Sequence, residues 1–302
     1  MILDDDFVLK SVNLEVNTDD FIEKCQSIRS KSHIKLNKKN IKAIGEAILC
    51  RNANVLFLQD NKLSDISNLK QFSRLTHLYL QNNDIVFMDG FQNLVCLEKL
   101  YLGSNSISVV ENLENCRELE ELHIGTQRLE PTEKMIFDPR SIEALAECLL
   151  VLNCPGNSIS SMKELEKLTS LEELDISCNK LNEIDEVCSS LEKMTSLHTI
   201  ACEFNPICTL RNYKGKMVMA MPSIKTFNNV DVTRGMYAFY KALTRDKEKK
   251  KAKATSSQEY VTMDDIHDIV KELPTGLREV VNRTEDYTAH IDLINRNEFT
   301  NK

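Results

Sequence analysis

The sequence predicts an α/β solenoid of leucine-rich repeats, because one short phrase recurs along it at a nearly fixed interval. In its fullest form the phrase is L-x-x-L-x-L-x-x-N-x-I/L. Most copies follow one another by about 22 residues, a period typical of a solenoid in which every repeat adds one strand to a parallel, concave sheet. Asparagine closes the phrase at six positions, which are Asn61, Asn83, Asn105, Asn157, Asn179 and Asn205.

The intervals between these positions predict about eight repeats. Lys39 and Gln127 hold the asparagine place in two further copies, at the same spacing from Asn61 and Asn105 that separates Asn61 from Asn83. Two intervals are longer, the one that ends at Asn157 and the one that ends at Asn205. An asparagine side chain suits the turn because it can hydrogen-bond backbone groups that the bend leaves unpaired. We therefore expect Lys39 and Gln127 to break this ladder of side chains.

Each repeat is too small to fold alone, so the repeats must share one core. About six aliphatic side chains per repeat contribute roughly 1.5 to 3 kcal/mol each on burial. Ordering the backbone costs roughly 1 to 2 kcal/mol per residue, and stacking on the neighbouring repeats must supply the difference. In the repeat that contains Asn83, the expected inward residues are Leu75, Leu78, Leu80, Ile85, Met88 and Phe91.

Both ends of the array need a cap, because a terminal repeat would otherwise expose its core. Within the N-terminal segment, residues 1–30, we expect a helix with Asn17 as its N-cap. Ile22, Cys25 and Ile28 follow at helical spacing. This helix is predicted to cover the front of the stack.

The repeats are assigned to residues 31–210, with an insertion at 130–148, and a second cap is expected at 211–240. Inside the insertion, Asp138 and Pro139 form a predicted helix start. The second cap resembles the C-terminal cap that follows repeats of the phosphatase-regulator and spliceosomal A-prime type. The residues that carry this likeness are Asn205, Pro206, Tyr213, Pro222, Ile224 and Phe227.

Residues 241–302 are expected to form a charged, mostly disordered tail. Residues 241–253 contain seven basic and two acidic residues and follow a helix expected to begin near Asp231. We interpret them as a solvated helix end or a flexible linker. A second interpretation is an electrostatic contact with an acidic surface such as the tubulin tail or a membrane. Further on, residues 263–273 form a short amphipathic stretch that suits partner binding or back-docking.

Composition and charge exclude several classes of protein. No segment approaches 18 consecutive apolar residues, and the acidic start is unlike a signal peptide, so we expect a cytoplasmic protein that binds no membrane. The net charge of −8 argues against nucleic acid as a partner. Ten cysteines are present, but none forms a C-x-x-C pair. Cys154 and Cys202 occupy inward strand positions, which favours reduced core cysteines.

Catalytic motifs are absent from the sequence, so we expect neither an enzyme nor a cofactor. None of G-x-x-x-x-G-K-S/T, G-x-G-x-x-G, G-x-S-x-G and H-E-x-x-H occurs, and eight glycines leave little material for a phosphate-binding loop. His77 and His123 fall on the exposed strand face at different offsets. No carboxylate or cysteine accompanies both at ligand spacing, so no metal site is predicted.

The exposed strand face carries a row of large side chains, one from each repeat. These residues lie between the last two inward residues of each strand and therefore point away from the core, onto the concave surface. Four consecutive rings are expected to stand side by side, about 4.8 Å apart. Aromatic residues at such a place anchor protein interfaces, although they also stack to shield a sheet. In order, the row reads Lys35, Phe57, Tyr79, Tyr101, His123, Asn153, Asp175 and Ala201.

Acidic residues gather on the same face in the later repeats. Beside an aromatic row they predict a partner that presents a basic rim around an apolar patch. The expected binding residues are therefore the four rings together with Glu173, Asp175 and Glu203. The full set of outward acidic positions is Glu120, Glu121, Glu172, Glu173, Asp175 and Glu203.

With these repeats and this cap, the sequence resembles the Sds22-like regulators of protein phosphatase 1, over roughly residues 30–240. The stretch GTQRLEPTEKMIFDPRSIEALA, residues 125–146, is similar to an insertion of one testis-type member. In that family the phosphatase contact lies on the concave face and uses aromatic and acidic residues. This character matches Phe57, Tyr79, Tyr101 and Asp175.

The resemblance implies a non-catalytic adaptor that binds the protein phosphatase 1 catalytic subunit. It also implies a location at the cytoskeleton, at a microtubule-organising centre such as the centrosome, or at a cilium. Val55 and Phe57 have the spacing of a V-x-F docking peptide, but no basic residue precedes them and both fall in a predicted strand. The alternative is a ciliary or axonemal scaffold that binds tubulin or a motor protein without the phosphatase. A spliceosomal role ranks below both.

Overall fold

The structure is a computed structural model, and it describes residues 1–11 and 20–254. Side chains are described as far as residue 245. Residues 1–232 form one compact unit, and residues 233–302 belong to a second. Two features of the sequence, Asn17 and the amphipathic stretch 263–273, lie outside the described residues.

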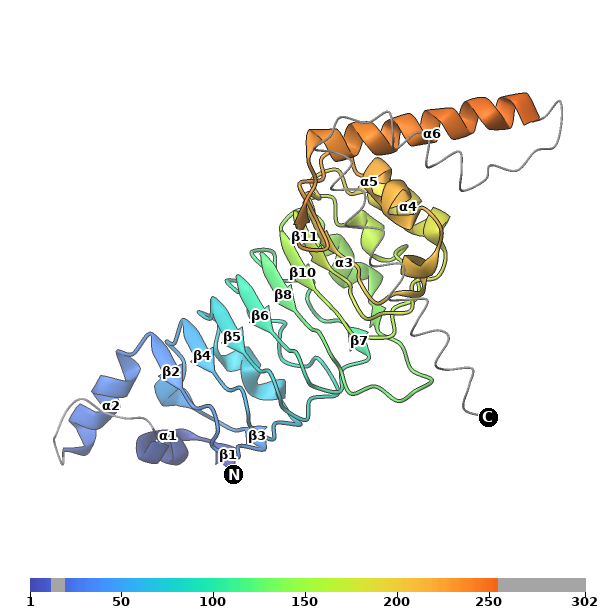
Figure 1. The fold of residues 1–302 in the computed structure, drawn as a ribbon. Helices are drawn as coiled ribbons and strands as arrows, with labels where there is room; N and C mark the ends of the chain where they lie inside the picture. Colours follow the sequence, from blue (N-terminus) through green and yellow to red (C-terminus); the bar gives the residue numbers. More distant parts are fainter. Residues whose placement is uncertain (12–19, 255–302) are drawn as a thin grey trace. The chain divides into compact units, whose positions relative to one another are not determined.

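One ten-stranded sheet runs through the first unit (Figure 1). Its order is β14-β13-β12-β11-β10-β8-β6-β5-β4-β2, and the eight strands from β12 to β2 are parallel neighbours. Equivalent residues pair in register, so that Leu56 lies opposite Leu78 and Leu78 opposite Leu100. The eight strands are β2 (His33–Lys35), β4 (Val55–Phe57), β5 (His77–Tyr79), β6 (Lys99–Tyr101), β8 (Glu121–His123), β10 (Val151–Asn153), β11 (Glu173–Asp175) and β12 (Thr199–Ala201).

The core lies between this sheet and the return segments on its other side. All six residues predicted to point inward in the repeat of Asn83 are fully buried, which confirms the inward pattern. Cys154 and Cys202, which directly follow β10 and β12, are likewise fully buried. The return segments include η1 (Ile48–Cys50), η2 (Ser67–Gln71), η3 (Leu165–Lys167), α4 (Ile184–Lys193) and η4 (Pro206–Thr209).

The asparagine side chains form a ladder that ties each repeat to the one before it. Asn83 is 1% exposed, and its Nδ2 donates to Leu80 O in its own repeat and to Leu58 O in the preceding one, both at 3.0 Å. Its Oδ1 accepts from Leu63 N, also at 3.0 Å. Asn61 and Asn105 form the corresponding bonds. Every rung thus satisfies buried backbone groups from two repeats.

Gln127 continues the ladder, and the prediction that it would break there is wrong. Its Nε2 donates to Leu102 O at 2.9 Å and to Ile124 O at 3.2 Å, and its Oε1 accepts from Ile107 N at 2.9 Å. Glutamine carries the same amide as asparagine on one more methylene, and at 7% exposure that amide reaches the same partners. Lys39 is exposed and forms no rung.

The residue before the ladder position has a left-handed backbone in all eight repeats. Asn, Asp and Gly tolerate this conformation, whereas bulky or branched residues are strained in it. The residues with positive φ at this place are Lys38, Asp60, Asn82, Ser104, Thr126, Gly156, Cys178 and Phe204.

The insertion forms a strand and a helix on the side opposite the sheet. Helix α3 (Pro139–Leu145) begins as predicted, because the Asp138 carboxylate caps it by accepting a hydrogen bond from Ser141 N. The sequence did not indicate β9 (Ile136–Phe137), which pairs in parallel with β7 (Val109–Val110). A strand of two residues is too short to show a hydrophobic period.

The N-terminal segment differs from the predicted single helix. Strand β1 (Ile2–Leu3) pairs with β3 (Ala43–Ile44), and helix α1 (Asp5–Ser11) follows it. Helix α2 (Phe21–Arg29) has Asp20 as its N-cap in place of Asn17. Its Ile28 is fully buried, but Ile22 is 64% exposed, because the first turn of the helix does not pack on the repeats as the pattern suggested.

Residues 211–232 end the first unit. Helix α5 (Tyr213–Ala220) is followed by β13 (Thr226–Phe227), which pairs in parallel with β12, and by β14 (Val230–Asp231), which pairs antiparallel with β13. Tyr213, Ile224 and Phe227 are buried. The Tyr213 hydroxyl accepts a hydrogen bond from Asn228 Nδ2 at 2.9 Å.

Helix α6 (Arg234–Ala254) contains the basic residues 241–253, which agrees with their interpretation as a helix end and not with a flexible linker. The helix continues through residue 241, where the charged tail was expected to begin. Lys, Ala, Glu and Arg are strong helix formers, and neither Gly nor Pro interrupts residues 241–254. No helix in the described ranges is long and apolar enough to span a membrane.

The ladder predicts similar destabilisation at Asn83 and Gln127. Replacing either residue with Ala removes its bonds to both repeats and leaves a buried N–H without its acceptor. Such losses cost roughly 1 to 3 kcal/mol for the unsatisfied group and about 0.5 to 1.5 kcal/mol for each bond. We expect Asn83→Ala and Gln127→Ala each to lower the free energy of unfolding by about 3 kcal/mol, measured by urea denaturation.

The exposed Gln92 supplies the control, since Gln92→Ala is expected to change stability by less than about 0.5 kcal/mol. If Gln127→Ala behaved like Gln92→Ala, Gln127 would not be a rung of the ladder.

Candidate functional site

The candidate site is the exposed side of the eight repeat strands, called the sheet face below. The in-register pairing brings Phe57, Tyr79, Tyr101 and His123 opposite one another on adjacent strands. Their ring centroids are 4.7, 4.7 and 4.4 Å apart, and the planes of adjacent rings differ by 9 to 11°. The expected row of four rings is therefore present as one continuous stack, called the ring stack below.

Stacking limits the part of each ring that is accessible to a partner. Strand spacing places the rings face to face, although isolated aromatic pairs prefer an offset or edge-to-face arrangement. The faces of Tyr79 and Tyr101 are therefore covered by neighbouring rings. All four side chains remain half-buried, so the stack presents a ridge of ring edges and Tyr hydroxyl groups.

A polar network surrounds the end of the stack nearest the acidic repeats. Lys99 Nζ donates to Glu121 Oε1 at 2.6 Å, and the Tyr101 hydroxyl donates to Glu121 Oε2 at 3.1 Å. His123 Nε2 lies 3.6 Å from the same Oε2, which is longer than a hydrogen bond. This nitrogen is buried and has no hydrogen-bond partner among the described residues.

Burial and the network shift the pKa values of these four groups. Burial, the largest influence, raises the pKa of Glu121, but hydrogen bonds from Lys99 and Tyr101 outweigh it and lower the pKa below its ordinary value. The bond to Glu121 raises the pKa of Lys99. Burial raises the pKa of Tyr101 to about 12 and lowers that of His123. At neutral pH the site therefore combines an ionised Glu121, a charged Lys99 and a neutral His123.

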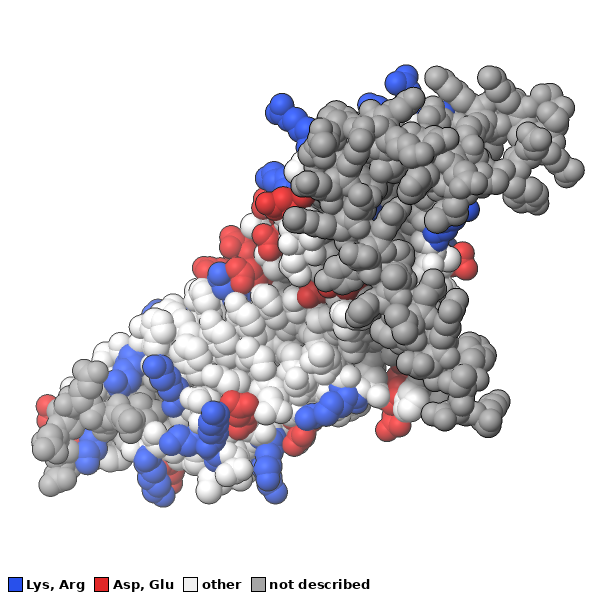
Figure 2. Space-filling view, in the orientation of Figure 1, with Lys and Arg blue, Asp and Glu red and all other residues white. Residues whose placement is uncertain are grey.

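The acidic residues of the later repeats are not equivalent. Asp175 is half-buried and bonded, because its Oδ2 accepts from Asn153 Nδ2 at 3.1 Å and its Oδ1 accepts from Ser177 N at 3.0 Å. Glu173 and Glu203 are exposed. Figure 2 shows Asp and Glu side chains gathered beside the part of the sheet that carries β8 to β11. Glu173 and Glu203 are thus the predicted carboxylates that a basic partner would meet.

The pairing of Lys99 with Glu121 was not predicted from the sequence. The two residues lie one repeat apart, so the same offset that aligned the rings also aligned this pair. The sequence also did not indicate that the side-chain oxygens of Gln59 and Gln81 are buried and lack hydrogen-bond partners among the described residues.

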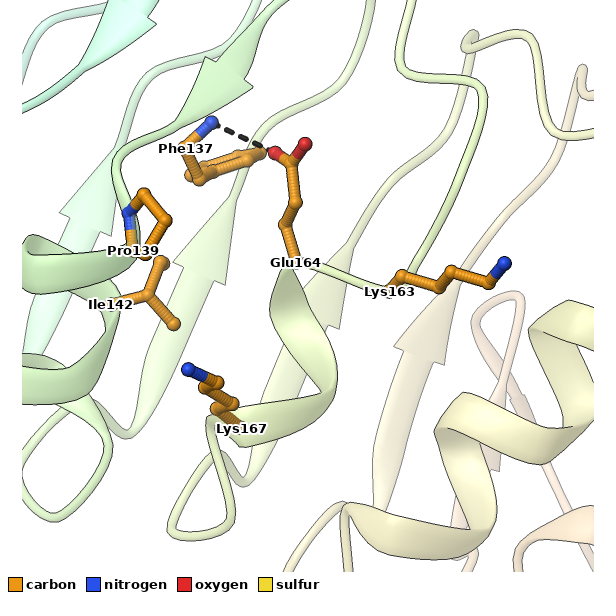
Figure 3. A pocket seen from close by; sticks show the side chains of 6 residues that line it. All are labelled: Phe137, Pro139, Ile142, Lys163, Glu164 and Lys167. Carbon is orange, nitrogen blue, oxygen red and sulfur yellow. Dashed lines mark hydrogen bonds between the residues drawn. The ribbon is translucent and has the colours of Figure 1, made fainter.

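A small cavity next to the insertion offers little room for a ligand (Figure 3). It measures about 90 Å³ and is lined by residues of α3, β9 and η3 and by their neighbours. Phe137 N donates to Glu164 Oε2 at 2.9 Å inside it, and Lys167 is paired with Glu143. Over residues 1–11 and 20–254, no cluster of His, Cys, Asp and Glu could hold a metal ion.

The fold and the sheet face define a leucine-rich-repeat protein whose candidate site is a broad surface. No protein-family model matches the chain. Among solved structures, an internalin (inlF) from Listeria monocytogenes is similar in fold, with a TM-score of 0.53 and 18% identity over 72% of this chain and 66% of that chain. Internalin C2 of the same organism gives a TM-score of 0.48 and 20% identity, over 62% of this chain and 80% of that chain.

Internalins are leucine-rich-repeat proteins, and the likeness confirms the predicted α/β leucine-rich-repeat solenoid. The chain spans just under two thirds of the first internalin's length.

The depressed pKa of His123 predicts a pH-dependent stability. A histidine whose pKa is lower in the folded state than in the unfolded state destabilises the fold when it is protonated. The stability present at pH 7.5 is therefore lost progressively as the pH falls below about 6.5, the ordinary value for histidine. We expect His123→Phe to lose less stability than the natural chain between pH 7.5 and 5.5, measured by urea denaturation at both values.

Tyr101→Phe is the matched control, because it alters the same network but keeps His123. It should retain the loss of stability between pH 7.5 and 5.5. An equal loss in the natural chain and His123→Phe would show that His123 does not titrate in this way.

Proposed function

We propose that the chain is a non-catalytic adaptor that binds a folded protein on its sheet face. The observation that carries this proposal is the ring stack, a fixed row of half-exposed aromatic edges bordered by carboxylates. Aromatic side chains are frequent anchors at interfaces. Rings that are already held by their neighbours lose little conformational freedom when a partner binds. The exposed Glu173 and Glu203 favour a partner with a basic rim.

The proposed partner is the catalytic subunit of protein phosphatase 1, with the complex directed to the microtubule cytoskeleton. Support comes from the resemblance to Sds22-like regulators, and in particular from the insertion, which looks like that of protein phosphatase 1 regulatory subunit 42. Phe57 lies in strand β4 and Val55 is 8% exposed, so neither residue is available as an extended docking peptide. Binding is therefore assigned to the sheet face.

A second candidate function is a ciliary or axonemal scaffold that binds tubulin or a motor protein. The basic helix α6 favours it, since seven Lys and Arg stand against two Asp and Glu in residues 241–254. Microtubule co-sedimentation that is lost on deletion of residues 241–302, without any phosphatase binding, would support this candidate over the first.

The first proposal predicts that removing the central rings weakens phosphatase binding. We expect the natural chain to bind the purified catalytic subunit, and Tyr79→Ala/Tyr101→Ala to bind less tightly by about 2 kcal/mol or more, the size of an interface hot spot. Isothermal titration calorimetry measures both affinities, and circular dichroism checks that both chains are folded.

The control is Phe87→Ala/Val95→Ala, which removes two exposed apolar side chains from outside the sheet face and should leave the affinity unchanged. No binding by the natural chain at micromolar concentrations would eliminate the phosphatase and leave the scaffold. An equal loss in both double variants would mean that the ring stack is not the contact.

A further inference from the structure

Four lysines gather on neighbouring turns at the start of the solenoid. Lys38, Lys39 and Lys42 follow strand β2, and Lys62 follows β4; all four are exposed. The two turns lie side by side, because Lys62 N donates to Ile41 O at 2.8 Å. Within the described part of the chain, none of the four lysines forms an ion pair. These residues are called the lysine turns below.

The lysine turns lie in a basic part of an acidic chain. Residues 20–80 contain eleven Lys and Arg against five Asp and Glu, whereas residues 98–203 contain nine against twenty-one. Figure 2 shows the corresponding Lys and Arg side chains gathered over the first repeats, at the lower left. The net charge of −8 therefore conceals two surfaces of opposite sign.

Lysine is unfavourable for the fold at two of these places. Lys38 has a left-handed backbone with φ of 59°, a conformation that Asp60, Asn82 and Gly156 tolerate better at the equivalent position. Thr126, Cys178 and Phe204 hold the same conformation in later repeats, so the strain at this position is shared. Lys39 holds a ladder position without forming a rung. Among the described side chains, Leu36 O accepts from Asn61 Nδ2 alone, whereas Leu58 O accepts from both Asn61 and Asn83. Residues that break a local rule without a structural gain indicate a functional site.

We infer that the lysine turns bind a short acidic polypeptide segment. Carboxylates on an extended chain suit lysine, whose ammonium group is a point charge on a flexible stem. Lysine binds phosphate as well as carboxylate, and the oligonucleotide in the experiment distinguishes the two. The acidic repeats repel a long polyanion such as nucleic acid, but a segment of a few residues fits within the basic part. This site lies outside the ring stack and does not depend on the proposed function.

The test uses the full chain and a fluorescein-labelled decaglutamate peptide, with fluorescence anisotropy at low and at physiological salt. We expect binding at low salt that weakens as salt rises. Lys38→Asn/Lys39→Asn should reduce the affinity about tenfold, in proportion to two lost exposed ion pairs. Because Asn suits the left-handed turn and restores a rung to Leu36 O, the same variant should unfold at an equal or higher urea concentration. A purely structural role for the lysines would lower that concentration.

Two further variants locate the site. Lys42→Gln/Lys62→Gln should also weaken binding, whereas Lys249→Gln/Lys250→Gln makes the same change of charge on α6 and should not. The inference is overturned if the natural chain does not bind the peptide at low salt, or if only the α6 variant loses binding. It is overturned also if a single-stranded oligonucleotide of equal charge binds more tightly through the same lysines.

Discussion

The fixed register between successive repeats is the constraint on which the rest of the structure depends. Each ladder amide bonds backbone atoms of its own repeat and of the preceding one, so residues one repeat apart must lie opposite each other. The longer interval between Gln127 and Asn157 does not disturb this arrangement. Gln127 N donates to the Asn157 side chain, and His123 still pairs with Asn153. The insertion is accommodated on the other side of the solenoid, in β9 and α3, and the columns of the sheet face continue across it.

The same register explains both the ring stack and its restricted chemistry. Because the strand spacing fixes the distance between them, four aromatic side chains at successive strand positions stack. Each ring then covers the face of its neighbour. A cation on a partner can approach the outer edges but not the π faces of Tyr79 and Tyr101, so cation–π recognition is limited there. Because Glu121 is already paired with Lys99 and Tyr101, it adds little free charge at the surface. Electrostatic recognition on the sheet face therefore falls to the exposed Glu173 and Glu203, while the stack supplies apolar area.

Periodicity allowed much of the fold to be predicted, and its failures have physical causes. The eight repeat strands, the inward residues and the row of rings all follow from constant offsets within the repeated phrase. Strands β1 and β9 have two residues each, too few to show a period. The expectation that Gln127 breaks the ladder rested on residue type. Glutamine and asparagine carry the same amide group, and that group forms the bonds. For the site, the ring positions followed from the offset, but the Lys99–Glu121 bond and the protonation of His123 depend on burial and distance, which a single sequence does not contain.

The opposite charges of the two surfaces set conditions on any partner. The acidic repeats attract a basic surface and the lysine turns attract an acidic one, so a single rigid partner that covered both would need matching charges at a matching separation. Both attractions act between exposed groups and weaken as salt rises. The apolar contact with the ring stack is much less sensitive to salt. Salt therefore separates the two contributions: the part of the binding energy that survives high ionic strength belongs to the rings, and the part that is lost belongs to the charges that orient the partner.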